Sequence, residues 1–158
     1  MSAPTTAGAR GDRAVGQDVL MDDNPGAVWL PLRFRDVDAF GHVYHAEYLT
    51  LLDEARTRWF RHVVGVANPA DYVLARIEID YVSSIVLADE SVRGTFEIER
   101  VGTSSLTLAE TLHTPDGRLV SRGRAVTVFR DADTGTSRRL TDDERRRAMA
   151  LVSASDPA

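Results

Sequence analysis

The sequence contains neither cysteine nor lysine, and these two absences exclude several kinds of chemistry. Without cysteine there is no disulfide framework, no thiolate nucleophile and no cysteine-ligated zinc or iron–sulfur cluster. Because all nineteen basic residues are arginine, there is also no Schiff-base intermediate on lysine and no lysine-based phosphate loop. Any catalysis by this chain therefore uses other side chains.

Long apolar runs and an excess of basic charge are also missing. No stretch approaches the roughly 18 apolar residues that a membrane-spanning helix needs, and residues 1–26 contain no apolar segment typical of a secretory signal. The formal net charge is −5, which argues against sequence-independent nucleic-acid binding because that needs a basic face. We therefore expect a cytoplasmic protein that binds neither nucleic acid nor a membrane.

The length and composition are those of one globular domain. The chain has 158 residues, of which 43% are hydrophobic and 27% charged. A chain of this size buries roughly two-thirds of the surface that its unfolded form exposes, so its core suffices for folding without metal or disulfide. We expect the ordered domain to span residues 27–152, and residues 1–26 and 153–158 to be disordered tails.

The first half of the domain predicts a strand, a polar loop and one long helix. Apolar residues alternate with other residues over 28–34, the pattern of a half-buried strand. The polar segment 35–42 is too short for a further element. From His45 to about Val64 the spacing is helical, and Gly65 ends the helix. The apolar stripe of this helix is Tyr48, Leu51, Leu52, Ala55, Trp59 and Val63.

The second half predicts four strands and a short helix. Alternating apolar residues mark strands over 72–82, 92–99, 106–112 and 119–129. The sequence TPDG at 114–117 predicts a tight hairpin, because proline presets φ and glycine accepts a left-handed conformation. Thr141 and Glu144 form a capping box for a helix through about Val152. Since only one long helix is available to cover five strands, we expect an α+β fold with that helix across one sheet face.

Four side chains that could carry chemistry lie within ten residues of one another, between the first strand and the helix: Asp36, Asp38, His42 and His45. The first N–H groups of a helix lack intrahelical acceptors and carry partial positive charge, so they would stabilise an oxyanion near His45. A carboxylate on the preceding loop could act as a general base or as a nucleophile toward the same carbonyl carbon. The residues alone therefore indicate acyl transfer or hydrolysis.

The segment FRDVDAFGHVYHAEYL at 34–49 and the sequence DEAR at 53–56 resemble the signature of hotdog-fold acyl-CoA thioesterases of the 4-hydroxybenzoyl-CoA thioesterase type. The likeness covers about residues 28–129. It implies a five-stranded antiparallel sheet wrapped around one long helix, in a homodimer or homotetramer with active sites between protomers. It also implies hydrolysis of an acyl-CoA or acyl-carrier-protein thioester to the free acid and thiol, with no metal and no bound cofactor.

The resemblance also assigns roles to individual residues. Asp38 matches the catalytic aspartate of the family, and His45 matches the helix-start residue whose backbone N–H polarises the thioester carbonyl. The sequence GHV at 41–43 is similar to the long-chain branch, whereas Tyr44 and His45 are similar to the Tol–Pal-linked branch, in which the histidine is catalytic. The acyl specificity therefore stays open. The expected substrate-binding residues are Gly41, His42, Tyr44, Tyr48 and Arg100.

Coenzyme A would need basic residues for its nucleotide phosphates. Members of the family with aromatic substrates carry a basic cluster near the end of the third strand, where this chain keeps only Arg100. Either other arginines replace that cluster, namely Arg122 and Arg124 or those within 138–147, or an acyl carrier protein delivers the acyl group.

Several of these residues also have plainer interpretations. Asp38 could cap a turn, Asp36 is expected to support the loop, and His45 could contribute only its backbone N–H. The same acidic and histidine side chains could hold a metal ion, although their spacing matches no recognised motif. Glu47 and Glu54 are expected to be structural. For the whole protein, two other functions stay open: an enoyl-thioester hydratase or dehydratase, and a non-catalytic acyl-CoA-binding protein.

Overall fold

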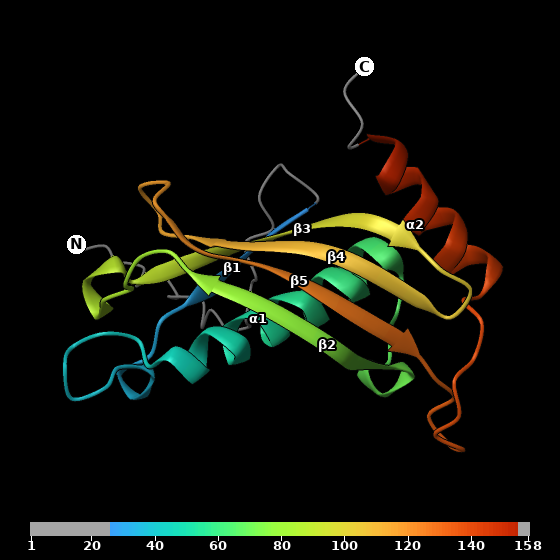
Figure 1. The fold of residues 1–158 in the computed structure, drawn as a ribbon, viewed down its shortest axis with the longest axis horizontal. Coiled ribbons are helices and arrows are strands. Elements are labelled where there is room, and N and C mark those ends of the chain that lie inside the picture. Colours follow the sequence, from blue (N-terminus) through green and yellow to red (C-terminus); the bar gives the residue numbers. More distant parts are fainter. Residues whose placement is uncertain (1–25, 155–158) are drawn as a thin grey trace, which may run out of the picture.

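The computed structural model describes residues 26–154, in which five antiparallel strands form one sheet with a long helix along one face (Figure 1). The strands are β1 (Ala27–Pro31), β2 (Tyr72–Tyr81), β3 (Ser91–Val101), β4 (Ser105–His113) and β5 (Leu119–Phe129). Their order across the sheet is β1-β3-β4-β5-β2, so β1 and β2 are the two edges. This arrangement confirms the predicted α+β architecture.

The long helix, α1 (His45–Trp59), continues into a π-helical turn over Phe60–Val64. Its predicted apolar stripe faces the sheet and is buried along most of its length. Gly65 ends the helix in a left-handed conformation (φ 87°), which a residue without Cβ adopts without strain. The predicted extent is therefore confirmed, whereas the wider last turn was not evident from the spacing.

The core lies between α1 and the inner face of the sheet. The predicted alternation is confirmed for β3 and β4, and the buried apolar residues there include Val92, Phe96, Ile98, Leu106, Leu108 and Leu112. The inward position between Leu108 and Leu112 is Glu110, whose buried carboxylate accepts two hydrogen bonds from Arg56 of α1, at 2.6 and 2.8 Å. Arg56 also pairs with Asp53. The apolar pattern did not predict this ion pair, since Glu110 is only a gap in the leucine stripe.

The first strand is shorter than predicted. β1 ends at Pro31, and Phe34 lies in a 3₁₀ turn with 87% of its surface exposed instead of facing the core. The cause is Asp36, whose carboxylate accepts hydrogen bonds from the Arg33 backbone N–H (2.8 Å) and from Arg33 Nε (3.1 Å). Side-chain hydrogen bonds of this local kind compete with strand pairing and turn the chain.

The edge strand β2 contains a bulge. Its register with β5 shifts between Leu74 and Arg76, so Ala75 is the extra residue. The bulge explains why Val73, which the alternation placed on the same face as Ile77, is exposed. In the part of the chain that the structure describes, β2 pairs with β5 alone, and one side of its backbone has no partner strand.

The second helix, α2 (Asp142–Ala154), packs on β3 and on the π-helical turn. The predicted capping box is confirmed: the Thr141 N–H donates to the Glu144 carboxylate (2.7 Å), and the Glu144 N–H donates to Thr141 Oγ1 (3.2 Å). The helix ends two residues beyond the predicted boundary at 152. Apart from Gly26 and those two residues, the predicted tails lie outside the described residues. No helix within 26–154 is long and apolar enough to cross a membrane.

Candidate active site

The loop between β1 and α1 is closed at its base by Asp36, which is fully buried. Its carboxylate accepts hydrogen bonds from Arg33, and its backbone carbonyl accepts the N–H of Tyr44 (2.9 Å). Arg33 also donates to Glu54 of α1 (3.3 Å), and its hydrogen bond to Asp36 raises the pKa of the guanidinium. Asp36 therefore supports the loop, as predicted, and ties its two ends together.

Asp38 lies within a short hairpin, residues 37–43, inside this loop. Its Oδ1 accepts the backbone N–H groups of Phe40 (2.9 Å) and His42 (3.3 Å), while its own N–H donates to the His42 carbonyl (2.8 Å). Gly41 has a φ of 82°, which the tight turn requires. No protein group within residues 26–154 hydrogen-bonds the second carboxylate oxygen, Oδ2. The carboxylate is thus fixed through one oxygen, and the other has no hydrogen-bond partner in the described part of the chain.

The helix α1 begins directly after this hairpin, and its first N–H groups lack a side-chain cap. Tyr44 is the N-cap residue, and its side chain makes no capping hydrogen bond. The Glu47 N–H donates to the Tyr44 carbonyl (2.8 Å), whereas the described part of the chain offers no acceptor to the N–H groups of His45 and Ala46. Together with the positive end of the helix dipole, these two donors suit a developing oxyanion.

Two tyrosines pack beside the helix start. The Tyr81 hydroxyl donates to the His45 carbonyl (3.1 Å), and the Tyr81 ring lies 5.1 Å from the ring of Tyr48. Tyr48 is buried, and its hydroxyl donates to the Ser83 carbonyl and accepts the Ile85 N–H, at 3.2 Å each. Burial raises the pKa of Tyr48, so the hydroxyl stays protonated at neutral pH. Since backbone groups occupy this hydroxyl and the side chain is buried, Tyr48 packs beneath the helix start, and its substrate-binding role stays a prediction.

Comparison with known protein families assigns the chain that carries this loop and helix start to a family. Residues 32–153 match the family model of the Thioesterase-like superfamily. The chain belongs to this superfamily. The predicted resemblance is therefore confirmed, and the protein is a thioester hydrolase by family.

Solved structures of similar proteins agree with this family. A thioesterase from Thermus thermophilus, in complex with coenzyme A and Zn, is 29% identical and has a TM-score of 0.70, covering 87% of this chain and 100% of that chain. A predicted thioesterase from Bacillus stearothermophilus is 26% identical (TM-score 0.71; 84% and 98% covered). A structure from Xanthomonas campestris assigned as an acyl-CoA thioesterase is 33% identical (TM-score 0.59; 70% and 94% covered). A search of curated protein sequences gives no match. The likeness confirms the predicted hotdog fold.

Six of the seven predicted site residues of the thioesterase lie in the hairpin 37–43 and the start of α1. They are Asp38, Gly41, His42, Tyr44, His45 and Tyr48. The rings of Tyr44 and His45 are both exposed, with their centroids 4.2 Å apart. Arg100 lies at the other end of the sheet. The loop follows Pro31 of β1, which pairs with Ser91 at the start of β3, whereas Arg100 is near the end of β3. The nine residue steps between Ser91 and Arg100 separate the two places by roughly 30 Å. The catalytic roles of Asp38 and His45 stay predictions.

Arg100 faces the side of the sheet away from α1. It borders a shallow hollow of about 250 Å³ that Arg76 and Arg124 also line. Arg124 pairs with Glu99 (2.6 Å) and Arg76 with Glu78, whereas Arg100 makes no ion pair within residues 26–154. Arg100 is therefore the arginine of this hollow whose charge is available to an anion.

Two other arginines of the thioesterase that could bind phosphate are held by carboxylates. Arg122 pairs with Asp80 (3.2 Å). Arg138 donates to both carboxylate oxygens of Glu144, at 2.8 Å each, and so ties the segment after β5 to α2. Arg138 is thus a structural residue at the end of the sheet opposite the hairpin.

The alternative roles weighed from the sequence can be compared with the structure. Within residues 26–154, no three histidine, aspartate or glutamate side chains converge to hold a metal ion. The Glu54 carboxylate binds Arg33, which also holds Asp36 at the base of the loop, and it lies 3.9 Å from Arg58. Its predicted structural role agrees with these contacts.

Sequence analysis missed the segment on which the hairpin rests. The Val43 N–H donates to the Ile85 carbonyl (2.8 Å), and His42 forms a β-bridge with Val86. These supporting residues contribute backbone groups, which leave no pattern of side-chain types. The spacing of residues therefore carried no signal that would have identified them.

Proposed function

We propose that this thioesterase hydrolyses acyl-CoA thioesters with the carboxylate of Asp38 and the first N–H groups of α1. One observation carries the proposal: Asp38 is held through one oxygen on a hairpin that leads directly into an uncapped helix start. A base or nucleophile and a set of oxyanion donors thus belong to one short segment. The family supplies the thioester as the substrate class, and the similar structure with bound coenzyme A supports an acyl-CoA.

In the proposed reaction, the thioester carbonyl oxygen accepts hydrogen bonds from the N–H groups of His45 and Ala46. These donors stabilise the negative charge that develops on this oxygen as the carbonyl carbon becomes tetrahedral. Oδ2 of Asp38 either takes a proton from the attacking water or attacks the carbon itself, giving an anhydride that water then hydrolyses. The exposed His45 ring is the proposed proton donor to the leaving thiolate. Both routes release the free acid and the thiol.

We also propose that the active unit is a homodimer, with its two sites between protomers. The edge strand β2 has backbone groups without a partner strand, and its exposed apolar residues are Val73, Leu74, Tyr81 and the adjacent Val82. Antiparallel pairing of β2 with a second copy would bring the Arg100 end of one sheet beside the Asp38 end of the other. Arg100 would then be available to the phosphates of a coenzyme A bound in the other copy's site. A homotetramer would combine two such dimers.

Thiol release tests the proposed reaction without background, because the chain contains no cysteine. Acetyl-, hexanoyl-, palmitoyl- and benzoyl-CoA, and the same acyl groups on an acyl carrier protein, would be assayed with a thiol reagent. We expect hydrolysis of at least one CoA thioester, and a loss of about 100-fold or more in kcat for Asp38→Asn. The control is Asp133→Asn, which removes an exposed carboxylate in the turn after β5 and should leave kcat within about twofold.

An unchanged kcat in Asp38→Asn would contradict the proposal. Loss of the enoyl absorbance of an enoyl-CoA without thiol release would favour the hydratase instead. Native mass spectrometry tests the dimer, and a monomer that keeps full activity would contradict the shared site.

We place the reaction in the cytoplasm, where acyl-CoA thioesters are formed and used. Fractionation of cells that express the full chain should recover it with cytoplasmic markers. Recovery in another fraction would contradict this location.

A further inference from the structure

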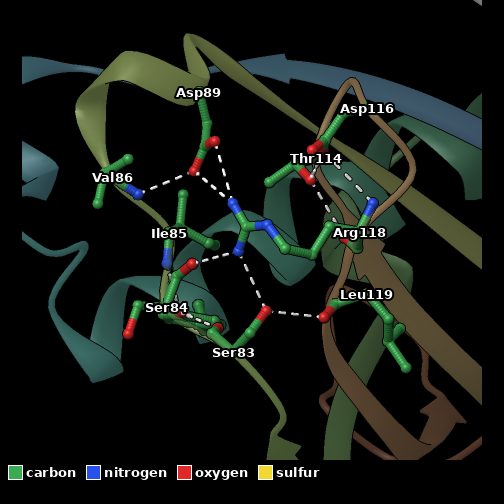
Figure 2. A network of polar contacts seen from close by, with 10 residues as sticks. Ser83, Ser84, Ile85, Val86, Asp89, Thr114, Asp116, Arg118 and Leu119 are labelled. Carbon is green, nitrogen blue, oxygen red and sulfur yellow. Dashed lines mark hydrogen bonds and ion pairs between the residues drawn. The ribbon is translucent and has the colours of Figure 1, made fainter.

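Arg118 forms a polar hub between the β4–β5 turn and the segment 83–89 (Figure 2). Its Nη1 donates to Ser83 Oγ (3.1 Å) and to the Ser84 carbonyl (2.6 Å), and its Nη2 donates to both carboxylate oxygens of Asp89, at 3.1 Å each. A planar guanidinium suits such a set of contacts, because its donors have a fixed geometry. One side chain thus holds both ends of segment 83–89, which connects β2 to β3.

The turn between β4 and β5 directs Arg118 toward this segment. The Thr114 N–H donates to the Arg118 carbonyl (3.0 Å), and the Gly117 N–H donates to the Thr114 carbonyl (2.9 Å). Asp116 accepts hydrogen bonds from the Thr114 hydroxyl and from the Arg118 N–H (3.4 Å), and the bond from Thr114 lowers the pKa of Asp116. The backbone is therefore fixed at the point where the Arg118 side chain leaves it (Figure 2).

The segment 83–89 that Arg118 holds also contacts the hairpin 37–43. The Ile85 carbonyl accepts the Val43 N–H (2.8 Å), and the Ile85 N–H donates to the Tyr48 hydroxyl (3.2 Å). Val86 forms a β-bridge with His42. His42 and Val43 connect the catalytic aspartate to the start of α1. A shift of segment 83–89 would therefore move the oxyanion donors relative to that aspartate.

We propose that Arg118 is a positioning residue for thioester hydrolysis, which sets the placement of the helix-start N–H groups relative to Asp38 through Ser84 and Asp89. This role rests on the proposed function. Arg118 contacts neither Asp38 nor His45 within the described structure, so it acts through backbone geometry. A displacement of about 1 Å in a reacting group can lower a rate about 100-fold. We therefore expect the loss of Arg118 to lower kcat and to leave KM nearly unchanged.

The test compares two arginine hubs at opposite ends of the sheet. Arg118→Gln and Asp89→Asn each break the contact behind the hairpin, while the control Arg138→Gln breaks the equivalent two-oxygen contact with Glu144. At a temperature where circular dichroism shows every variant folded, we expect the first two to lower kcat about 10-fold to 100-fold with KM within about threefold. The control should keep kcat within about twofold.

A second readout does not depend on activity. Amide hydrogen exchange of Val43 should be faster in Arg118→Gln than in the wild type, and unchanged in Arg138→Gln. The positioning role is overturned if Arg118→Gln keeps its kcat, if Arg138→Gln loses as much, or if Val43 exchange stays the same. A wild type that releases no thiol, or that does not need Asp38, instead contradicts the proposed function, so the two failures are distinguishable.

Discussion

The two ends of the sheet are built in different ways. At the aromatic end, defined by Phe60, Tyr72 and Phe129, ring centroids lie 4.6 and 6.1 Å from that of Phe60, and both phenylalanines are fully buried. At the site end, defined by residues 32–44, 83–89 and 114–118, the aromatic residues Phe34 and Phe40 are 87% and 86% exposed. Buried rings therefore pack the first end, in addition to the Arg138–Glu144 contact, whereas the exposed loop of the second end is fixed mainly by hydrogen bonds.

This difference follows from what each end has to do. In the proposed reaction a thioester has to reach the carboxylate of Asp38, so packed side chains cannot cover its hairpin. The chain fixes the hairpin with Asp36, Asp38 and Arg118 instead, each of which bonds backbone groups nearby. Burial of apolar surface at the aromatic end supplies stability. We therefore expect substitutions at the aromatic end to change stability, and those at the site end to change the rate.

The largest effect on stability should come from Phe60→Ala. The substitution leaves a cavity among buried rings and should lower the free energy of unfolding by about 3–5 kcal/mol. Urea denaturation measures this loss, and kcat is measured at a temperature where the variant is folded. If kcat stays within about twofold of the wild-type value, the packing of the aromatic end does not affect the rate. A folded variant with a strongly lowered kcat would show that the two ends are coupled.

A smaller loss is expected for Glu110→Gln, at the interface between α1 and β4. The variant removes the buried carboxylate that Arg56 binds and leaves only the ion pair with the more exposed Asp53. The loss should be limited to about 3 kcal/mol because the amide oxygen still accepts one hydrogen bond. The double variant Arg56→Met/Glu110→Leu should regain most of this stability in denaturant unfolding. A double variant as unstable as the single one would show that loss of the ion pair itself, and not the buried Arg56 charge left without Glu110, determines the loss of stability.

Two glycines offer a matched comparison between the ends. Gly117 and Gly135 have φ values of 85° and 70°, and an added Cβ would meet no atom within 4 Å at either position. Alanine should therefore cost about 1 kcal/mol of backbone strain at each. Only Gly117→Ala should also lower kcat, because Arg118 follows it. Equal kcat values in the two variants would count against the difference between the ends.

The smallest effect concerns pH at the end opposite the site. Burial alone would raise the pKa of Glu144, but the hydrogen bonds from Arg138 and Thr141 outweigh it and lower the pKa below 4.5. The folded state thus holds this proton less tightly than the unfolded state, so the stabilisation is complete above about pH 4.5 and is lost as the pH falls below it. Glu144→Gln should flatten that part of the stability curve measured by urea unfolding. A curve that keeps its wild-type slope would contradict this assignment.

The sequence predicted the fold well where the pattern of apolar residues reflected only their burial in the core. Period-two alternation gave β3, β4 and β5, and the helical stripe ended where Gly65 ends α1. The alternation failed where a polar side chain overrode it. The carboxylate of Asp36 turned the chain before Phe34 could face the core, and the buried Glu110 found its partner on a helix distant in sequence.

The candidate site was predictable in part for a similar reason. Asp38 and His45 stand in one contiguous segment, so their proximity follows from the sequence itself. Arg118 reaches the site through a contact with residues about 30 positions away, and its partners include a backbone carbonyl. Contacts of this kind depend on how strands are ordered in the sheet, which no local pattern specifies.

The most direct test asks whether the helix-start N–H groups polarise a bound thioester carbonyl. An acyl-CoA carrying ¹³C at this carbonyl would be bound to Asp38→Asn, which should turn it over slowly, and its carbonyl stretch measured by isotope-edited infrared difference spectroscopy. The account predicts a lower stretching frequency than for the same thioester in water, because oriented donors at His45 and Ala46 withdraw electron density from the carbonyl. A frequency equal to or above that in water would contradict it.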